Sequence, residues 1–168
     1  MIVNKVGRFE KVTGDEYAYT MLNNDDDIDW VNYEKIKLPN RATNHSAGYD
    51  FYLTRDIELQ PGESVVIETL VRCFIEPGWF LAIFPKSGLG FKYNVTLANT
   101  VGIVDADYYN SDNGGHIKVK LINKGDRILS LEKGDKFCQG VFMPYGITYD
   151  DDNYVKEERN GGFGSTGR

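Results

Sequence analysis

The chain has 168 residues, of which 41% are hydrophobic and 26% are charged, so we expect one folded domain rather than a disordered chain. Its formal net charge of -6 argues against a general nucleic-acid binder, because such proteins carry a basic surface. There is no apolar run of about 18 residues, and the start, MIVNKVGRFEKV, lacks the apolar core of a signal peptide. We therefore expect a cytoplasmic protein with no membrane segment and no nucleic-acid partner.

Short runs rich in β-branched and aromatic residues dominate the chain, and turns that contain glycine or proline separate them. The expected strands are 3–12, 47–53, 64–75, 79–85, 95–98, 102–104, 116–123, 128–131 and 136–144. No window of about 12 residues shows convincing helical periodicity. Many short strands at this spacing predict a barrel or a sandwich, so we expect an all-β fold.

The two cysteines and the two histidines give no sign of a metal site. Cys73 and Cys138 lie in apolar surroundings typical of strands, VVIETLVRCFI and KFCQGVF. We interpret both as buried free thiols, with a disulfide as the less favoured alternative. His45 and His116 have no metal-ligating residue at a useful spacing, and we interpret both as surface or hairpin residues.

Two segments differ from the expected β-domain. Residues 13–35 are polar and contain the acidic run DDDID, which predicts a solvated insertion or loop. A calcium loop is the less favoured alternative, because the glycine turn and the distal glutamate are missing at the required spacing. Residues 149–168 end in a Gly- and Ser-rich stretch and predict a flexible arm that orders on a ligand. We therefore divide the chain into a β-domain, 1–148, and a C-terminal arm, 149–168.

Two segments carry candidate chemistry. The apolar run GIV places Asp105 at the end of an expected strand, where a carboxylate can act as a general base toward water. The alternative is an aspartate that caps the turn. Residues 85–90 read PKSGLG and supply lysine, serine and accessible backbone N–H groups, all of which suit a phosphate. The spacing of a Walker A loop is absent, so a simple turn between strands is the alternative.

The last residues, RNGGFGSTGR, combine cationic, aromatic and hydroxyl side chains with glycines. Arg159 can hold a terminal phosphate with two hydrogen bonds. Phe163 can stack on a flat base, a contact worth about 1–3 kcal/mol in nucleic-acid systems. An extended arm of about 19 residues reaches on the order of 60 Å, which is enough to cross to another subunit. The alternative is a tail that stays disordered.

In this order, the segments resemble the five motifs of the trimeric deoxyuridine triphosphate nucleotidohydrolases, or dUTPases, of the type found in Gram-positive bacteria and their phages. The matching segments are SAGYD at 46–50, PKSGLG at 85–90, NTVGIVDADY at 99–108 with GHI at 115–117, GDKFCQG at 134–140, and the glycine-rich end at 159–167. The resemblance covers about residues 36–168. It implies a jelly-roll-like β-fold and a homotrimer with three active sites between subunits, each closed by a C-terminal arm. It also implies hydrolysis of dUTP to dUMP and pyrophosphate with Mg²⁺, by attack of water on the α-phosphorus.

The resemblance implies a role for each matching residue of the third motif. Asp105 matches the carboxylate that orients and activates the water. Tyr108 matches the aromatic side chain that packs on the deoxyribose and excludes a 2′-hydroxyl. Asn99 matches the side chain that reads the uracil edge, together with backbone groups of the hairpin at Gly102 and Val104.

The other motifs match residues that bind the phosphates and the base. Ser87 matches the phosphate-binding hydroxyl, with Lys86 and the N–H group of Gly88 beside it. Gln139 matches an amide near the phosphates, and Asp50 matches an acid that supports the metal indirectly, through water. In the arm, Arg159 should hold the γ-phosphate and Phe163 should stack on uracil. The remaining expected substrate contacts are Gly164, Ser165 and Thr166. Lys86 departs from the family, which usually has arginine there; lysine keeps the charge but loses the planar fork.

Other functions fit the residues less well. A dCTP deaminase shares this fold, but that family has a catalytic glutamate where this chain has Lys120. A zinc deaminase is excluded because no cluster of Cys and His ligands is present. An alternative of another class is a nucleotide-dependent regulatory binding protein on the same fold, with the acidic insertion and the loop 109–114 as docking sites for a partner. An inactive relative is disfavoured by the intact Asp105, Arg159 and Phe163.

Overall fold

The computed structural model describes residues 4–24 and 26–156. Its strands are β1 Gly7–Lys11, β2 Asn40–Arg41, β3 Tyr49–Tyr52, β4 Ile57–Leu59, β5 Ser64–Glu68, β6 Val71–Ile75, β7 Trp79–Pro85, β8 Val95–Leu97, β9 Gly102–Val104, β10 Lys118–Asn123, β11 Leu129–Leu131 and β12 Lys136–Pro144. Its helices are α1 Gly14–Asn23, α2 Trp30–Glu34 and α3 Ser87–Tyr93, with two 3₁₀ helices, η1 Ala106–Asn110 and η2 Asp151–Asn153. Strands predominate, so the predicted all-β class is confirmed.

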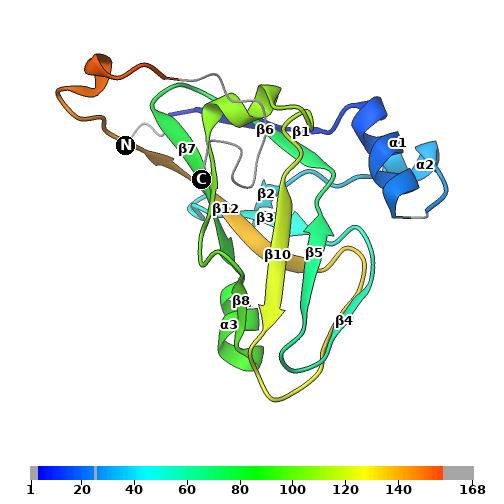
Figure 1. The fold of residues 1–168 in the computed structure, drawn as a ribbon. Coiled ribbons are helices and arrows are strands. Elements are labelled where there is room, and N and C mark those ends of the chain that lie inside the picture. Colours follow the sequence, from blue (N-terminus) through cyan, green and yellow to red (C-terminus); the bar gives the residue numbers. More distant parts are fainter. Residues whose placement is uncertain (1–3, 25, 157–168) are drawn as a thin grey trace.

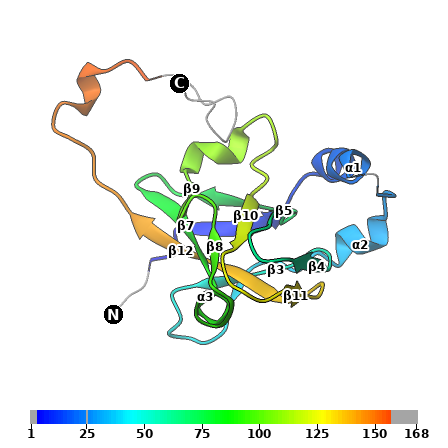
Figure 2. The same cartoon turned by 60° about the horizontal axis from the view of Figure 1, so that its bottom comes forward.

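Antiparallel pairing assembles the described strands into four small sheets. The largest has the order β2-β3-β12-β7-β9, the next has the order β5-β10-β8, and β1-β6 and β11-β4 form two pairs. Figures 1 and 2 show α1 and α2 standing at one side of the strands, while residues 145–156 extend from the other side. Within the described residues, no helix has the length and apolar character needed to span a bilayer.

One apolar core lies between the sheets. On β6 the buried side chains are Val71, Cys73 and Ile75, the alternate positions expected of a strand with one face on a core. Cys73 and Cys138 are both buried and free, as predicted. Burial raises the pKa of the Cys73 thiol to about 12, so this side chain serves packing rather than chemistry.

The expected strand 64–75 is interrupted, and it forms β5 and β6. The break lies at Leu70, whose φ of 57° falls in the left-handed region. Beside it, the buried Thr69 hydroxyl donates to the Ile117 carbonyl at 2.6 Å and accepts from the Val71 N–H group at 3.2 Å. The expected strands did not include β2 and β4, which have two and three residues.

The sequence predicts a solvated insertion or loop at residues 13–35, and the loop is wrong, because this segment contains α1 and α2. Thr13 caps α1 by accepting a hydrogen bond from the Glu16 N–H group, and Asp29 caps α2 through the N–H groups of Val31 and Asn32. With ten residues, α1 is shorter than a window in which helical periodicity can be recognised.

Aromatic side chains fix the two helices on the β-domain. Tyr17 is buried with Val12 and Leu70 in a second, smaller core. Its ring lies 5.6 Å from that of Trp30 and 5.0 Å from that of Tyr33, measured between ring centroids. The segment is therefore an inserted helical unit with its own packing, and we call it the helical insertion (residues 13–35).

The two histidines have different environments. His45 is exposed, as predicted. The prediction that His116 is a surface or hairpin residue is wrong, because its side chain is completely buried. Its imidazole lies between the helical insertion and the β-domain, and a lone histidine in a sequence gives no sign of such a location.

Candidate active site

The third-motif hairpin consists of β8, a tight turn and β9, and it joins two sheets: β8 pairs with β10 in the three-stranded sheet, and β9 pairs with β7 at the edge of the largest sheet. At its turn, Thr100 has a φ of 64°, which is uncommon for a residue other than glycine. Gly102 pairs with Ile83 of β7, and a Cβ atom on Gly102 would lie only 3.1 Å from the Ile83 Cβ. Any other residue at this position would push Ile83 aside by a few tenths of an ångström, which gives Gly102 a structural reason besides the predicted substrate contact. Asn99, in the turn, is exposed.

Asp105 follows directly after β9, as the sequence predicts. Val104 is buried, and Asp105 has extended backbone angles (φ -79°, ψ 160°) before η1 begins at Ala106. The buried Val104 and the pairing of β9 with β7 therefore fix the backbone before Asp105, while the Asp105 side chain is partly accessible. A carboxylate held in this way has the accessibility that a general base needs.

Tyr108 lies in η1 and is buried by the loop that follows it. Its hydroxyl donates to the His116 carbonyl at 2.9 Å and accepts from the Asn113 side-chain amide at 2.8 Å. The Ser111 hydroxyl donates to the Tyr108 carbonyl at 2.7 Å. The residues between η1 and β10 therefore hold the Tyr108 side chain at its hydroxyl group.

An ionic cluster attaches η1 to β1 and β6. Glu10 accepts hydrogen bonds from the Tyr109 hydroxyl at 2.6 Å, from Arg8 at 2.6 Å and from Arg72 at 2.8 Å. These bonds, that from Tyr109 first, lower the pKa of Glu10 below its ordinary value. The Arg72 guanidinium also lies 4.3 Å from the centre of the Tyr109 ring. No local sequence pattern predicts this cluster, because β1, β6 and η1 are far apart in the chain.

The first, second and fourth motifs meet around Asp50. Its side chain is 3% exposed, and its two carboxylate oxygens lie 2.6 Å from the Lys86 Nζ atom and 2.8 Å from the Lys136 Nζ atom. Burial opposes ionisation, but the ion pairs with Lys136 and Lys86 outweigh it, so the pKa of Asp50 is below its ordinary value of 3.8. Lys86 thus acts on a carboxylate of its own chain, and Lys136 is a member of the group that the sequence reasoning missed.

Gln139 and Ser87 lie next to this group. Gln139 pairs with Asp50 in the register between β12 and β3, and a Cβ atom on Gly48 would collide with the Gln139 side chain. Ser87 and Gly88 begin α3, and both are exposed. The first N–H groups of a helix have no partner within it, so they are available to an anion. The sequence predicted a phosphate-binding loop or a turn here, and the segment is a short helix.

Strand β7 separates the two groups of predicted site residues. Val104 pairs with Leu81 near the start of β7, so Asp105 lies beyond that end, whereas Lys86 follows the other end. Six residues of strand span about 20 Å. One chain therefore holds Asp105 and Lys86 near opposite ends of β7. Arg159, Phe163, Gly164, Ser165 and Thr166 lie outside the described residues.

The paired Asp50 predicts an acid-sensitive contribution to stability. Because its pKa is lower in the folded chain than the ordinary value of 3.8, its contribution is present above about pH 4 and is lost as the pH falls through the folded value. Asp50→Asn should lower the free energy of unfolding at neutral pH by about 1–2 kcal/mol and flatten its dependence on acid. Denaturant unfolding from pH 7 to pH 3 measures both effects.

The matched control is Asp126→Asn, since the Asp126 side chain is 96% exposed. Its unfolding curves should follow those of the unmodified chain at every pH, because exposed ion pairs contribute little. Parallel acid curves for Asp50→Asn and the unmodified chain would contradict the role given to the two lysines.

Comparison with known proteins identifies the family. The family model described as dUTPase matches residues 34–167, so the match begins at the end of the helical insertion. The deoxyuridine 5'-triphosphate nucleotidohydrolase of Lactococcus lactis is 42% identical over 133 residues, which cover 79% of this chain and 89% of that protein. The crystal structure of the dUTPase from Streptococcus mutans is 33% identical, with a TM-score of 0.64 over 83% of this chain and 97% of that one.

A more distant structure agrees in fold. The dUTPase of Staphylococcus bacteriophage 80alpha with dUPNHPP is 19% identical, with a TM-score of 0.63 over 98% of this chain and 100% of that one. The likeness to these structures confirms the predicted jelly-roll-like β-fold. From the family match and the identity with the Lactococcus lactis protein, the chain belongs to the dUTPase family.

Proposed function

We propose that this protein hydrolyses dUTP to dUMP and pyrophosphate, which limits uracil in DNA and supplies dUMP for the synthesis of dTMP. The observation that carries the proposal is the family match over residues 34–167, which contains all five motifs. The curated relative from Lactococcus lactis is named for this reaction.

In the proposed mechanism, Asp105 acts as the general base. Its carboxylate accepts a proton from water, and the oxygen of that water attacks the α-phosphorus while pyrophosphate leaves. The extended backbone after β9 supports this role, because it presents the side chain beside the hairpin that would hold the nucleoside. A general base of this kind contributes about 10²- to 10⁴-fold to a rate.

The third-motif hairpin would read the nucleoside. Asn99 and the backbone at Gly102 and Val104 would bind the uracil edge, and the close contact of Gly102 with Ile83 would hold this segment against β7. Tyr108 would pack on the deoxyribose. Its hydroxyl is held by Asn113 and His116, so the ring has little freedom to move aside for a 2′-hydroxyl.

The phosphates would contact Ser87, the N–H group of Gly88, Lys86 and Gln139. These groups lie at the start of α3 and on the neighbouring β12. From the arm, Arg159 would hold the γ-phosphate, Phe163 would stack on uracil, and Gly164, Ser165 and Thr166 would add contacts. The arm would close the site and exclude water other than the attacking molecule.

The described residues fit Mg²⁺ only as an ion held by phosphate and water. No group of three carboxylate, histidine or cysteine side chains suited to a metal occurs in 4–24 or 26–156. Both oxygens of Asp50 already face ammonium groups, so Asp50 would act on the ion only indirectly, through water. When bound, the ion would neutralise part of the triphosphate charge and hold the phosphates for in-line attack.

The separation of Asp105 from Lys86 supports a homotrimer with active sites between subunits. Because the two groups lie near opposite ends of β7, we infer that one dUTP would contact Asp105 of one copy and Lys86 of another. Apolar side chains that are exposed in one copy also support a homotrimer, since such residues mark association surfaces. They include Ile103 on β9, Met143 on β12, and Ile147, Tyr149 and Val155 beyond it.

Tyr108→Ala should relax the discrimination between dUTP and UTP. Without the ring, a 2′-hydroxyl meets no obstacle, so the ratio of kcat/KM for the two nucleotides should fall by about tenfold to a hundredfold. Steady-state pyrophosphate release with each nucleotide measures the ratio. Tyr93→Ala is a control of the same chemistry outside the site, and its ratio should be unchanged. An unchanged ratio in Tyr108→Ala would mean that other groups read the sugar.

The direct test of the proposed function is pyrophosphate release with Mg²⁺ from dUTP, dCTP, dTTP and UTP, each assayed alone. Turnover confined to dUTP supports three proposals together: hydrolysis to pyrophosphate, selection of uracil over the other bases, and selection of deoxyribose over ribose. If dUTP binds but no nucleotide is hydrolysed, the proposal is wrong, and a nucleotide-dependent binding protein on the same fold becomes the better account.

A further inference from the structure

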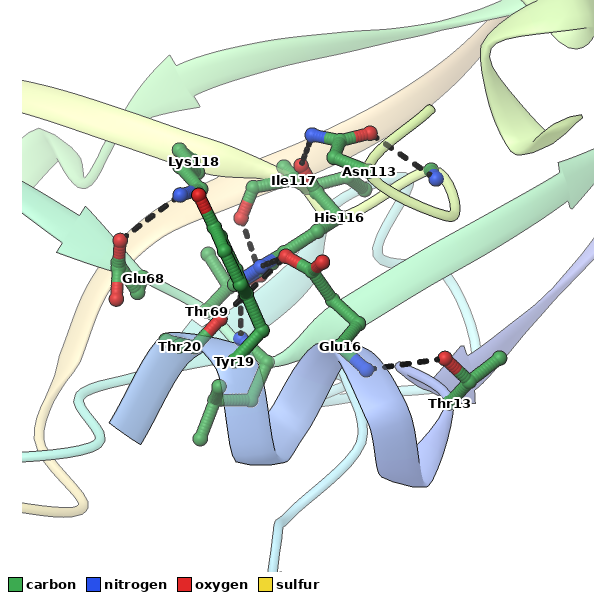
Figure 3. A network of polar contacts seen from close by, with 12 residues as sticks. Thr13, Glu16, Tyr19, Thr20, Glu68, Thr69, Asn113, His116, Ile117 and Lys118 are labelled. Atoms are coloured by element: carbon green, nitrogen blue, oxygen red, sulfur yellow. Dashed lines mark hydrogen bonds and ion pairs between the residues drawn. The ribbon is translucent and has the colours of Figure 1, made fainter. Parts of the chain in front are cut away.

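The helical insertion contacts the third motif through one buried pair of side chains. The Glu16 Oε1 atom of α1 lies 2.8 Å from the Nδ1 atom of His116. The His116 side chain is completely buried, and the Glu16 side chain is 11% exposed. Figure 3 shows Glu16 projecting from α1 onto the imidazole, with Thr69 and Thr20 beside the pair. The family model begins only at residue 34, so Glu16 lies outside the part of the chain that it matches.

The hydrogen bonds of His116 define its tautomer. The Leu70 N–H group donates to the Nε2 atom at 3.1 Å, so this nitrogen carries no proton. The Nδ1 atom must therefore carry the proton, and its N–H group donates a hydrogen bond to Glu16. A neutral imidazole agrees with burial, which lowers the pKa of His116 below its ordinary value of 6.5. The ring is consequently held at both nitrogens, by α1 on one side and by the break between β5 and β6 on the other.

The backbone of the same residue holds Tyr108. The His116 carbonyl accepts a hydrogen bond from the Tyr108 hydroxyl at 2.9 Å and another from the Asn113 side chain at 3.2 Å. Asn113 also donates to the Tyr108 hydroxyl at 2.8 Å. A continuous set of hydrogen bonds therefore runs from Glu16 through His116 to the ring that would contact the deoxyribose.

We propose that Glu16 and His116 are positioning residues for Tyr108, through which the helical insertion contributes to discrimination between deoxyribose and ribose. This inference rests on the proposed function. Neither residue touches the substrate; Glu16 fixes the imidazole, and the imidazole fixes the carbonyl that holds Tyr108. The other charged groups that face the imidazole are Lys118 of β10 and Glu68 of β5, which pair with each other at 2.9 Å. Among the described residues around the imidazole, Glu16 is therefore the carboxylate that forms a hydrogen bond with His116.

Glu16→Ala tests the inference, with kcat and KM measured for dUTP and for UTP. Loss of the acceptor frees the imidazole, so the Tyr108 ring should become less well placed. The ratio of kcat/KM for dUTP over UTP should fall by about tenfold, mainly through a higher KM for dUTP. Glu16→Gln keeps an acceptor oxygen at the same reach and should restore most of the ratio.

Two further variants separate positioning from a loss of fold. Asp15→Ala removes an exposed carboxylate from the same turn of α1 and should leave the ratio unchanged. If Glu16→Ala does not fold, Glu16→Asp serves in its place, because it keeps the charge and shortens the side chain by one methylene. A purely structural role would lower kcat for both nucleotides equally, since less of the protein would be active.

An unchanged dUTP-to-UTP ratio in a folded Glu16 variant, or a ratio that Glu16→Gln does not restore, would overturn the inference while leaving the proposed function intact. Absence of dUTP hydrolysis by the unmodified chain would overturn the proposed function and the inference together.

Discussion

Asp105→Asn is expected to reduce dUTP turnover by about 10³-fold while leaving dUTP binding nearly unchanged. An amide cannot accept the proton of the attacking water, yet it has the size and shape of the carboxylate. The residue lies between a buried strand and η1, so the substitution should not disturb the hairpin. Pyrophosphate release measures the rate, and isothermal titration with dUTP measures the binding.

Asp112→Asn is the matched control. Asp112 is an exposed aspartate on the loop after η1. Its substitution removes the same charge from the same region, and Asp112 has no part in the proposed mechanism. Its turnover should equal that of the unmodified chain. A rate retained by Asp105→Asn would remove the general base from the account, and loss of dUTP binding would show that Asp105 serves binding instead.

Truncation after Lys156 should lower kcat/KM for dUTP by about 10²- to 10³-fold and leave the proposed trimer intact. The removed residues include Arg159 and Phe163, which would supply the γ-phosphate contact and the stacking on uracil. A stacked aromatic ring alone is worth about 1–3 kcal/mol, and a charge-assisted bidentate contact adds to it. Pyrophosphate release measures the activity, and light scattering measures the mass of the assembly.

The position of the cut explains why assembly should survive. The last residue of either core is Cys138 on β12, and residues 145–150 are already exposed. Phe163→Ala in the full chain removes the stacking contact alone, and it should lower kcat/KM for dUTP by about tenfold to a hundredfold. If the truncated chain is monomeric, the arm is part of the assembly rather than a closing segment, and full activity after truncation would remove it from the site.

Much of the β-domain could be predicted because each strand carries its own signal. The bounds of β7, β9 and β12 agree with the sequence prediction, because each is a run of mostly apolar residues next to recognisable turn residues. The location of Asp105 at the end of β9 followed from the apolar run before it. The helical insertion could not be predicted in the same way, since α1 is short and only three-dimensional packing buries Tyr17.

The sequence motifs predicted which residues belong to the candidate site, but not which of them contact one another. The sequence identified Asp50 and Lys86 separately, but only the sheet register brings them together and adds Lys136. Likewise, His116 lies 100 residues from Glu16 in the chain, and no local pattern marks such a pair. Interactions between distant residues depend on topology, whereas strand ends and turns depend on neighbours.

The most direct test of the account is hydrolysis of dUTP by the unmodified protein in water labelled with a heavy oxygen isotope, with the products analysed by mass spectrometry. Attack on the α-phosphorus predicts one labelled oxygen in dUMP and none in pyrophosphate. Label in pyrophosphate, or release of inorganic phosphate instead, would contradict the proposed mechanism, and the absence of any product would contradict the proposed function.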